Sequence, residues 1–554
     1  MATEQVSTGV PGLDDVLSGG YLPGCPTLVM GQPGCGKTLL LLQFLADGAK
    51  QGHRAVCATC SEAPERMLAY MVALGHPAEA WVRDGRLVMV DLRPEPGEVV
   101  LGALDQEVVK IRLDAALAEG GVIAPEARLG IDDLNRLAYA FNPDGVARVQ
   151  TLALLRLLRE SGITTIMSAA DDAATRAALI DYAVDAVIGL RQTVAARLMT
   201  RTLRVLKMRG VPHGTNEYPF MIDSHGPSLL PPARGMGGHR SREGLVSTGH
   251  ERLDTLLGGG LYRGGSVMVS GTSGTGKTTL LGQIAQGLCT DGRRVIYVTL
   301  EQDQSELIHD FKGVGIDVEP HRATGRLRFH RARSVDCSLE EHLIRIVRLA
   351  EAEAPDAIFV DAVTSFADLD SVAAVKSMVL RLIDACKSRG VMVVLTELLA
   401  DAAGMASSLG LSSMLDAWIR LELHRQTSEY VRLIRVLKGR GVRTSQQIKE
   451  FQITSAGIAI DDPYLGGGAF VFGTEKLIRE REDHRERIAL ERRLEQLRRE
   501  LEVLPQAYDA RVDQTVLERD KAIESLREEI ETLRTRLAAS KSSEEAVREA
   551  RGQP

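Results

Sequence analysis

Two glycine-rich octapeptides of the chain each end in a lysine followed by a threonine. They read GQPGCGKT (residues 31–38) and GTSGTGKT (residues 271–278), and both fit the pattern G-x-x-x-x-G-K-[ST]. In such a loop, backbone N–H groups bind phosphate oxygens, the lysine reaches the outer phosphates, and the hydroxyl ligates Mg²⁺. We therefore predict two nucleotide-binding loops whose lysines also serve catalysis. The predicted nucleotide contacts are Gly31, Gln32, Pro33, Gly34, Cys35, Gly36, Lys37 and Thr38, and Gly271, Thr272, Ser273, Gly274, Thr275, Gly276, Lys277 and Thr278.

The same chemistry needs a carboxylate at the end of another strand to hold Mg²⁺. The apolar run in PDAIFVDAVTS ends at Asp361, and RLGIDDLNRL offers Asp132, with Asp133 as the less favoured choice. Together with the hydroxyls of Thr38 and Thr278, Asp132 and Asp361 are the predicted metal ligands. For Asp132, a helix-capping role is the alternative.

A carboxylate that accepts a proton is also required. The apolar segment VIYVTL is followed by Glu301 and Gln302, and the segment AVCATC is followed by Ser61 and Glu62. A carboxylate at the C-terminal end of a strand in an open sheet lies beside the ligand crevice. We predict that Glu301 and Glu62 are catalytic, and the alternative for each is a solvated acid in a loop.

The chain repeats itself without a gap. Residues 7–38 align with residues 247–278, which implies two whole domains and not a solenoid of small units. In each copy an apolar strand precedes the loop and a helical pattern follows it, which predicts the α/β class. The expected organisation is a first domain over 1–230, a linker over 231–246, a second domain over 247–470 and a tail over 475–554.

The tail carries leucines at the spacing of a heptad seam. Leu490, Leu494, Leu497 and Leu501 recur at steps of four, three and four, and the rhythm resumes after Pro505. Charged residues of both signs fill the other positions, which favours a coiled coil. The alternative is one amphipathic helix folded back on a domain. We interpret the tail as a helical coiled-coil extension that serves assembly.

Composition limits the classes of function. The chain has 554 residues, 44% of them hydrophobic and 25% charged, with a net charge of −7. This balance argues against a main task of holding duplex nucleic acid, because phosphates require a basic face. With no apolar run of about 18 residues and no signal-peptide pattern, we expect a cytoplasmic protein without a membrane partner. The seven cysteines show no disulfide framework, and Cys57 and Cys60 are interpreted as buried strand residues.

Taken together, these features resemble the KaiC branch of the RecA-type ATPases over about residues 5–465. The resemblance rests on the S-T-G-x-x-x-L-D segments, both loops, the strand-end acids, and LKMRGVPHGTNEYPF (206–220) with its counterpart LKGRGVRTSQQIKEF (437–451). It implies two tandem RecA-like P-loop domains with mostly parallel sheets, and ATP and Mg²⁺ as cofactors. It also implies a homo-hexameric ring with a circadian-type signalling role and a KaiB-like regulator. Stacking of two rings through the tail is an additional option.

The resemblance also assigns roles to residues outside the loops. The LKxRG segments would contact the nucleotide of the neighbouring subunit, where a cation stabilises charge on the γ-phosphate. The family's second domain also phosphorylates itself, and Ser412 and Ser413 match that position, with Glu301 as the proton acceptor. The alternative for the two serines is a helix cap or turn. The matching residues for the contacts between subunits are Lys207, Arg209, His213, Lys438 and Arg440.

The chain departs from the family at the strand-end acids, where the family carries two adjacent glutamates. The first copy has Ser61 before Glu62, and the second has Glu301 before Gln302. If the leading glutamate is the base, the first domain binds ATP but hydrolyses it slowly, whereas the second domain keeps its catalytic capacity. The alternatives are a RecA- or DnaB-like DNA-dependent ATPase, which the acidic balance disfavours, and a scaffold that nucleotide merely cements.

Overall fold

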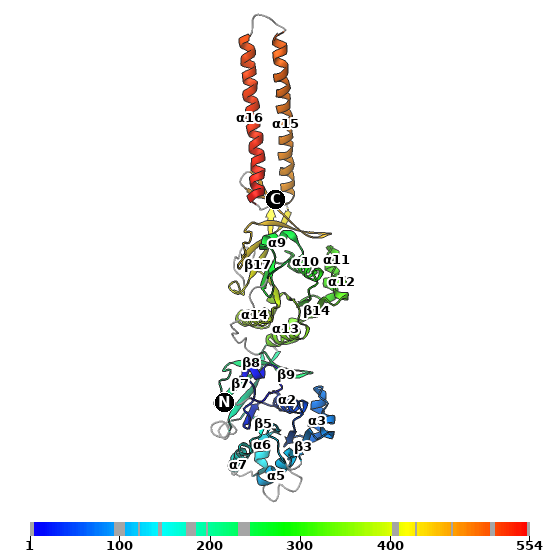
Figure 1. The fold of residues 1–554 in the computed structure, drawn as a ribbon, viewed down its shortest axis with the longest axis vertical. Coiled ribbons are helices and arrows are strands. Elements are labelled where there is room, and N and C mark those ends of the chain that lie inside the picture. The colour runs from blue at the N-terminus through cyan, green and yellow to red at the C-terminus, as the bar shows by residue number, and fades with distance from the viewer. Residues whose placement is uncertain are drawn as a thin grey trace. The chain divides into compact units, whose positions relative to one another are not determined.

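The computed structural model describes eleven stretches of the chain. Within the described part, the chain divides into two compact units (Figure 1), and each large sheet has nine strands. No helix among these residues combines the length and the apolar character that crossing a membrane requires. The described stretches are residues 5–93, 106–119, 122–141, 147–172, 184–195, 198–230, 244–400, 409–426, 429–466, 469–509 and 516–550.

The first sheet has the strand order β3-β2-β4-β5-β1-β6-β7-β8-β9, parallel from β3 to β6 and antiparallel beyond. Its strands are β1 (Pro26–Gly31), β2 (Ala55–Thr59), β3 (Leu87–Asp91), β4 (Arg128–Asp132), β5 (Thr164–Ala170), β6 (Ala186–Ala195), β7 (Leu198–Met208), β8 (Glu217–Asp223) and β9 (Gly226–Leu229). The helices of this stretch are α1 (Leu13–Val16), α2 (Lys37–Lys50), α3 (Pro64–Ala73), α4 (Ala78–Arg83), α5 (Gln106–Leu117), α6 (Leu134–Phe141) and α7 (Ala147–Glu160).

The second sheet repeats this order as β14-β13-β15-β16-β12-β17-β18-β19-β20. Its strands are β12 (Ser266–Gly271), β13 (Val295–Thr299), β14 (Leu327–Arg331), β15 (Ala357–Asp361), β16 (Met392–Leu398), β17 (Ala417–Gln426), β18 (Glu429–Gly439), β19 (Lys449–Thr454) and β20 (Gly457–Asp461). The helices of this stretch are α9 (Glu251–Leu257), α10 (Lys277–Thr290), α11 (Gln304–Gly313), α12 (Glu319–Ala323), α13 (Leu339–Glu353) and α14 (Val372–Lys387), with the 3₁₀ turns η3 (Ser334–Asp336) and η4 (Val363–Asp368). Two small antiparallel pairs are β10 (Leu245–Val246) with β11 (Leu261–Tyr262), and β21 (Tyr464–Gly466) with β22 (Ala469–Val471).

The predicted α/β class with two tandem, mostly parallel sheets is confirmed. The central strands β1 and β12 are buried along their whole length, as expected for parallel strands that are covered on both faces. The predicted linker lies almost entirely outside the described residues, and the domain limits stay a prediction.

Strand direction gives each sheet two edges with different roles. We call the edge where the parallel strands end the carboxyl edge, and the edge where they begin the amino edge. Thr59 pairs with Asp132, and Thr299 pairs with Asp361, so these strand ends meet at the carboxyl edge. At the amino edge of the second sheet, Ala417 pairs with both Val267 and Gly439.

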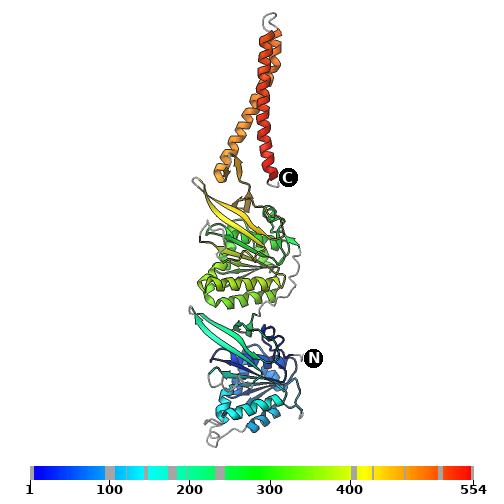
Figure 2. The ribbon, with the colours of Figure 1, turned by 90° about the vertical axis from the view of Figure 1, so that its left-hand side faces the viewer.

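The tail forms two long helices, α15 (Gly473–Asp509) and α16 (Val516–Ala550), which lie side by side (Figures 1 and 2). Leu494, Leu497 and Ile530 are buried, and Arg493 reaches Glu529 across the pair at 3.4 Å. The first helix includes Pro505 and is described as far as Asp509. The heptad seam of α15 therefore has a partner in the same chain, and a role in assembly stays a prediction.

Candidate nucleotide-binding sites

The first predicted loop joins β1 to α2 at the carboxyl edge. Gly34 and Gly36 have φ of +79° and +105°, and a Cβ at Gly36 would lie 2.7 Å from Ile222 Cδ1, so this position requires glycine. Lys37 Nζ lies across the loop and donates to the carbonyl oxygens of Gly31 (2.8 Å) and Gln32 (3.0 Å). The loop therefore presents backbone N–H groups and an ammonium at the start of a helix, which is the environment that phosphate binds.

The second loop has the same construction between β12 and α10. Gly274 and Gly276 have φ of +76° and +94°, and Lys277 Nζ donates to the carbonyl oxygens of Gly271 (2.9 Å) and Thr272 (2.8 Å). Burial lowers the pKa of the Lys277 ammonium, and the carboxylates of Asp361 and Glu301 oppose that shift. The negative charges of Asp361 and Glu301 therefore act on the Lys277 ammonium.

The predicted metal acids meet the predicted loop hydroxyls. Thr38 Oγ1 donates to Asp132 Oδ1 at 2.9 Å, and Thr278 Oγ1 donates to Asp361 Oδ2 at 2.8 Å. Asp133, the substitute for Asp132, has a φ of +66° and pairs instead with Arg136 at 3.5 Å.

These oxygen donors fit Mg²⁺, which is held in such sites by one or two carboxylates together with phosphates of the substrate. Among the described residues, no cluster of three or more His, Cys, Asp or Glu side chains could hold a metal without such a substrate.

Each metal acid also receives hydroxyl bonds that the sequence patterns did not reveal. Asp132 accepts from Ser61 Oγ (3.1 Å) and Ser168 Oγ (2.9 Å). Asp361 accepts from Tyr297 OH (2.7 Å) and from Thr396 Oγ1. Burial raises the pKa of the Asp132 carboxyl, and its three hydroxyl donors oppose that shift. These donors come from strands on either side of the acid, so only the strand order could have identified them.

The two strand-end glutamates have different surroundings. Glu62 accepts a hydrogen bond from Tyr70 OH at 2.9 Å and lies 3.2 Å from Arg66 Nε, both on α3. Glu301 is exposed two residues beyond β13 and acts on Lys277 through its charge. Glu301 therefore combines the leading position with a charge that acts on the loop lysine Lys277.

The two cysteines of the C-x-x-C sequence are buried, as predicted. Cys57 lies within β2, and Cys60 directly follows that strand. Burial raises the pKa of both thiols, which keeps them protonated and unreactive.

The residues expected to act between subunits gather at the amino edge of the second sheet. Ser412 and Ser413 are exposed on a turn before β17, and their carbonyl oxygens accept hydrogen bonds from Lys438 Nζ and from Arg440. The phosphate loop follows the other end of β12, a strand of six residues. The turn and its own loop are thus separated by roughly 17 Å of strand, at about 3.3 Å per residue.

The first sheet has the same arrangement. Arg209 directly follows β7, its N–H donates to the carbonyl of Asp185 (3.0 Å), and its guanidinium lies 3.7 Å from the Asp185 carboxylate. Lys207 belongs to the end of β7, and Nδ1 of His213 lies 3.5 Å from the carbonyl oxygen of Val211. The structure does not bring these side chains to their own phosphate loop.

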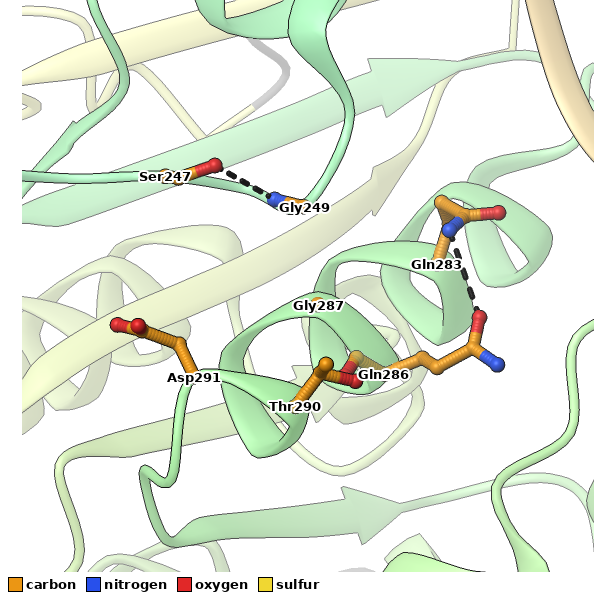
Figure 3. A pocket seen from close by; sticks show the side chains of 7 residues that line it. All are labelled: Ser247, Gly249, Gln283, Gln286, Gly287, Thr290 and Asp291. Carbon is orange, nitrogen blue, oxygen red and sulfur yellow. Dashed lines mark hydrogen bonds between the residues drawn. The ribbon is translucent and has the colours of Figure 1, made fainter.

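A shallow pocket of about 340 Å³ lies on the second half of α10 (Figure 3). Gln283, Gly287 and Asp291 line it together with Ser247. Because α10 begins at Lys277, the pocket lies along the helix beyond the phosphate loop and is separate from the predicted nucleotide site.

The chain is similar in sequence to known proteins. A family model described as "ATPase: KaiC" matches residues 6–234 and again residues 246–464. The chain is 31% identical over 478 residues to the circadian clock protein KaiC2 of Synechocystis sp., covering 85% of this chain and 84% of that protein. It is 28% identical over 481 residues to the circadian clock oscillator protein KaiC of Synechococcus elongatus, covering 85% and 92%.

Proposed function

The chain belongs to the KaiC family of ATPases, and we propose that it works as a homo-hexameric ring that binds ATP with Mg²⁺. The second domain hydrolyses ATP and phosphorylates Ser412 and Ser413 of the neighbouring subunit. The resulting nucleotide and phosphorylation state is a signal of the circadian type, read by a KaiB-like regulator. The relatives named above are circadian clock proteins, which supports this role.

The observation that carries the ring proposal is the separation of the two edges. Lys438 and Arg440 lie at the amino edge, and the phosphate loop of the same sheet lies at the carboxyl edge. Neither cation can therefore reach the γ-phosphate of its own nucleotide, whereas a neighbour that presents its amino edge to this loop can supply both. A head-to-tail interface of this kind closes into a ring when the rotation between neighbours is a whole fraction of a turn.

We propose that Glu301 accepts the proton of the attacking group in the second domain. In hydrolysis, a water oxygen bonds to the γ-phosphorus, the bond from that phosphorus to the bridging oxygen of ADP breaks, and the water proton passes to Glu301. In autophosphorylation, Oγ of Ser412 or Ser413 takes the place of water. Bound Mg²⁺ would neutralise phosphate charge, and Thr278 and Asp361 would hold it.

In the first domain we propose slow hydrolysis. Ser61 occupies the leading position and donates to Asp132, so it cannot act as a base. Glu62 is paired with Arg66 and Tyr70. This domain would bind ATP mainly to hold the ring together.

Phosphate release tests these assignments. Glu301→Gln should lower turnover by about 10²- to 10⁴-fold in the second domain, because a general base contributes that factor. Glu62→Gln should change little, and Glu306→Gln, an acid of the α11 capping box, is the matched control. Loss of all turnover in Glu62→Gln alone would contradict the proposal.

Mass spectrometry after incubation with Mg-ATP tests the autokinase step. We expect phosphate on Ser412 and Ser413 in the unaltered chain and none in the Lys277→Ala variant, because that variant lacks the phosphate-binding ammonium. Unmodified Ser412 and Ser413 under turnover would refute the step.

A further inference from the structure

The metal acids of the two domains are held by different sets of hydroxyls. Asp132 and Asp361 each accept hydrogen bonds from three hydroxyls. Two of these donors correspond between the domains: the threonine of the phosphate loop, and a hydroxyl on the strand next to that of the acid, β5 or β16. Ser168 and Thr396 share that last position, since they pair with Val29 and Val269 of the loop strands. The third donor is Ser61 in the first domain and Tyr297 in the second.

These third donors come from different positions of the repeated sequence. Tyr297 pairs with Phe359 as Cys57 pairs with Gly130, so tyrosine and cysteine occupy the same strand position. The position that carries Ser61 in the first domain carries Glu301 in the second. The Cys57 thiol is a poor donor on a short side chain, whereas the phenol of Tyr297 reaches the acid at the strand end.

We propose that Tyr297 is a positioning residue that orients Asp361 toward the metal and thereby leaves the leading strand-end position free for Glu301. In the first domain, which has no such tyrosine, Ser61 donates the third hydrogen bond to Asp132. The position that carries the proposed base Glu301 in the second domain is therefore used to hold the metal acid in the first. The proposal rests on the proposed function, because it assumes Mg-ATP at the loop.

The surroundings of Tyr297 suit this role. Its side chain is fully buried, and its ring lies 5.4–6.2 Å from the rings of Phe311, Phe329 and Phe359. The phenol therefore has little freedom, and its bond fixes Oδ2 of Asp361. Groups that orient a metal-holding side chain typically change metal affinity or activity by about 10- to 100-fold when they are removed.

The test uses the full-length chain carrying Lys37→Ala, so that nucleotide binds at the second loop alone, with and without Tyr297→Phe. EPR of free Mn²⁺ in the presence of ADP measures metal affinity, and ADP affinity is measured separately in EDTA. We expect Tyr297→Phe to weaken Mn²⁺ binding by about 10- to 100-fold and to leave ADP binding in EDTA unchanged. Phenylalanine keeps the aromatic packing, so the variant should fold.

Two further measurements separate positioning from a structural role. Excess Mg²⁺ should restore phosphate release by Tyr297→Phe, because the defect lies in holding the metal. Ser61→Ala, in a chain carrying Lys277→Ala, should weaken Mn²⁺ binding at the first loop in the same way. An unchanged Mn²⁺ affinity in Tyr297→Phe, or a rate that Mg²⁺ does not rescue, would overturn the proposal. A parent chain that binds no Mn²⁺ with ADP would refute the proposed function itself.

Discussion

The first residue of β1 differs from the first residue of β12, and the hydrogen bonds at the amino edges of the two sheets differ with it. In the second domain, the backbone N–H and Oγ of Ser266 donate to Asp416 Oδ2 at 2.9 and 3.0 Å. Pro26 stands at this position in the first domain and has neither donor. Asp185, the counterpart of Asp416, instead pairs with Arg159 at 2.6 Å and with Arg209 at 3.7 Å. A carboxylate thus holds Arg209, whereas Arg440 bonds to a carbonyl.

This difference predicts unequal costs for removing the two aspartates. Asp416→Ala should lower the free energy of unfolding by about 1–3 kcal/mol, because it removes the carboxylate that accepts from the buried backbone N–H of Ser266. Asp185→Ala removes ion pairs with the half-exposed Arg159 and Arg209 and should cost about 0–1 kcal/mol. Urea denaturation of both variants measures the two costs. A larger cost for Asp185→Ala would contradict the assignment.

The elements of the fold were predictable where the signal is local. The glycine pattern predicted both loops and the helices that follow them, and the apolar run of the second copy predicted the strand that ends at Asp361. The hydrogen bonds of Tyr297, Ser168 and Thr396 to the metal acids were not predicted, because they depend on which strands are neighbours in the sheet. The leucine rhythm of the tail resumes only after Pro505 in the sequence, yet α15 includes that residue.

The packing of α15 against α16 can be tested by changing a buried residue of the pair. Leu497 is fully buried, so Leu497→Asp places an unpaired charge in the seam of α15 and α16. We expect the pair to separate and circular dichroism at 222 nm to fall, with unchanged ATP hydrolysis. Leu477→Asp is the matched control, since Leu477 is 55% exposed. Equal loss of helix signal in both variants would contradict the packing.

If the tail joins two rings, removing it should change the number of chains in the assembled particle. Mass photometry with ATP should give a hexamer for a chain shortened after residue 474. If the tail joins two rings, the full chain should give a dodecamer, because the seam would then extend between copies. A hexamer for both chains would contradict a role of the tail in joining rings.

We propose that each active site of the second domain is completed by the neighbouring subunit. Arg440→Ala chains retain Glu301, and Glu301→Gln chains retain Arg440, so a mixed ring can combine the two intact residues only between neighbours. The most direct measurement is phosphate release by each variant alone and by their 1:1 mixture. We predict little turnover by either variant alone, and about a quarter of the unaltered rate for the mixture, since random mixing unites both residues at that fraction of interfaces. A mixture no faster than the average of the two variants would contradict the account.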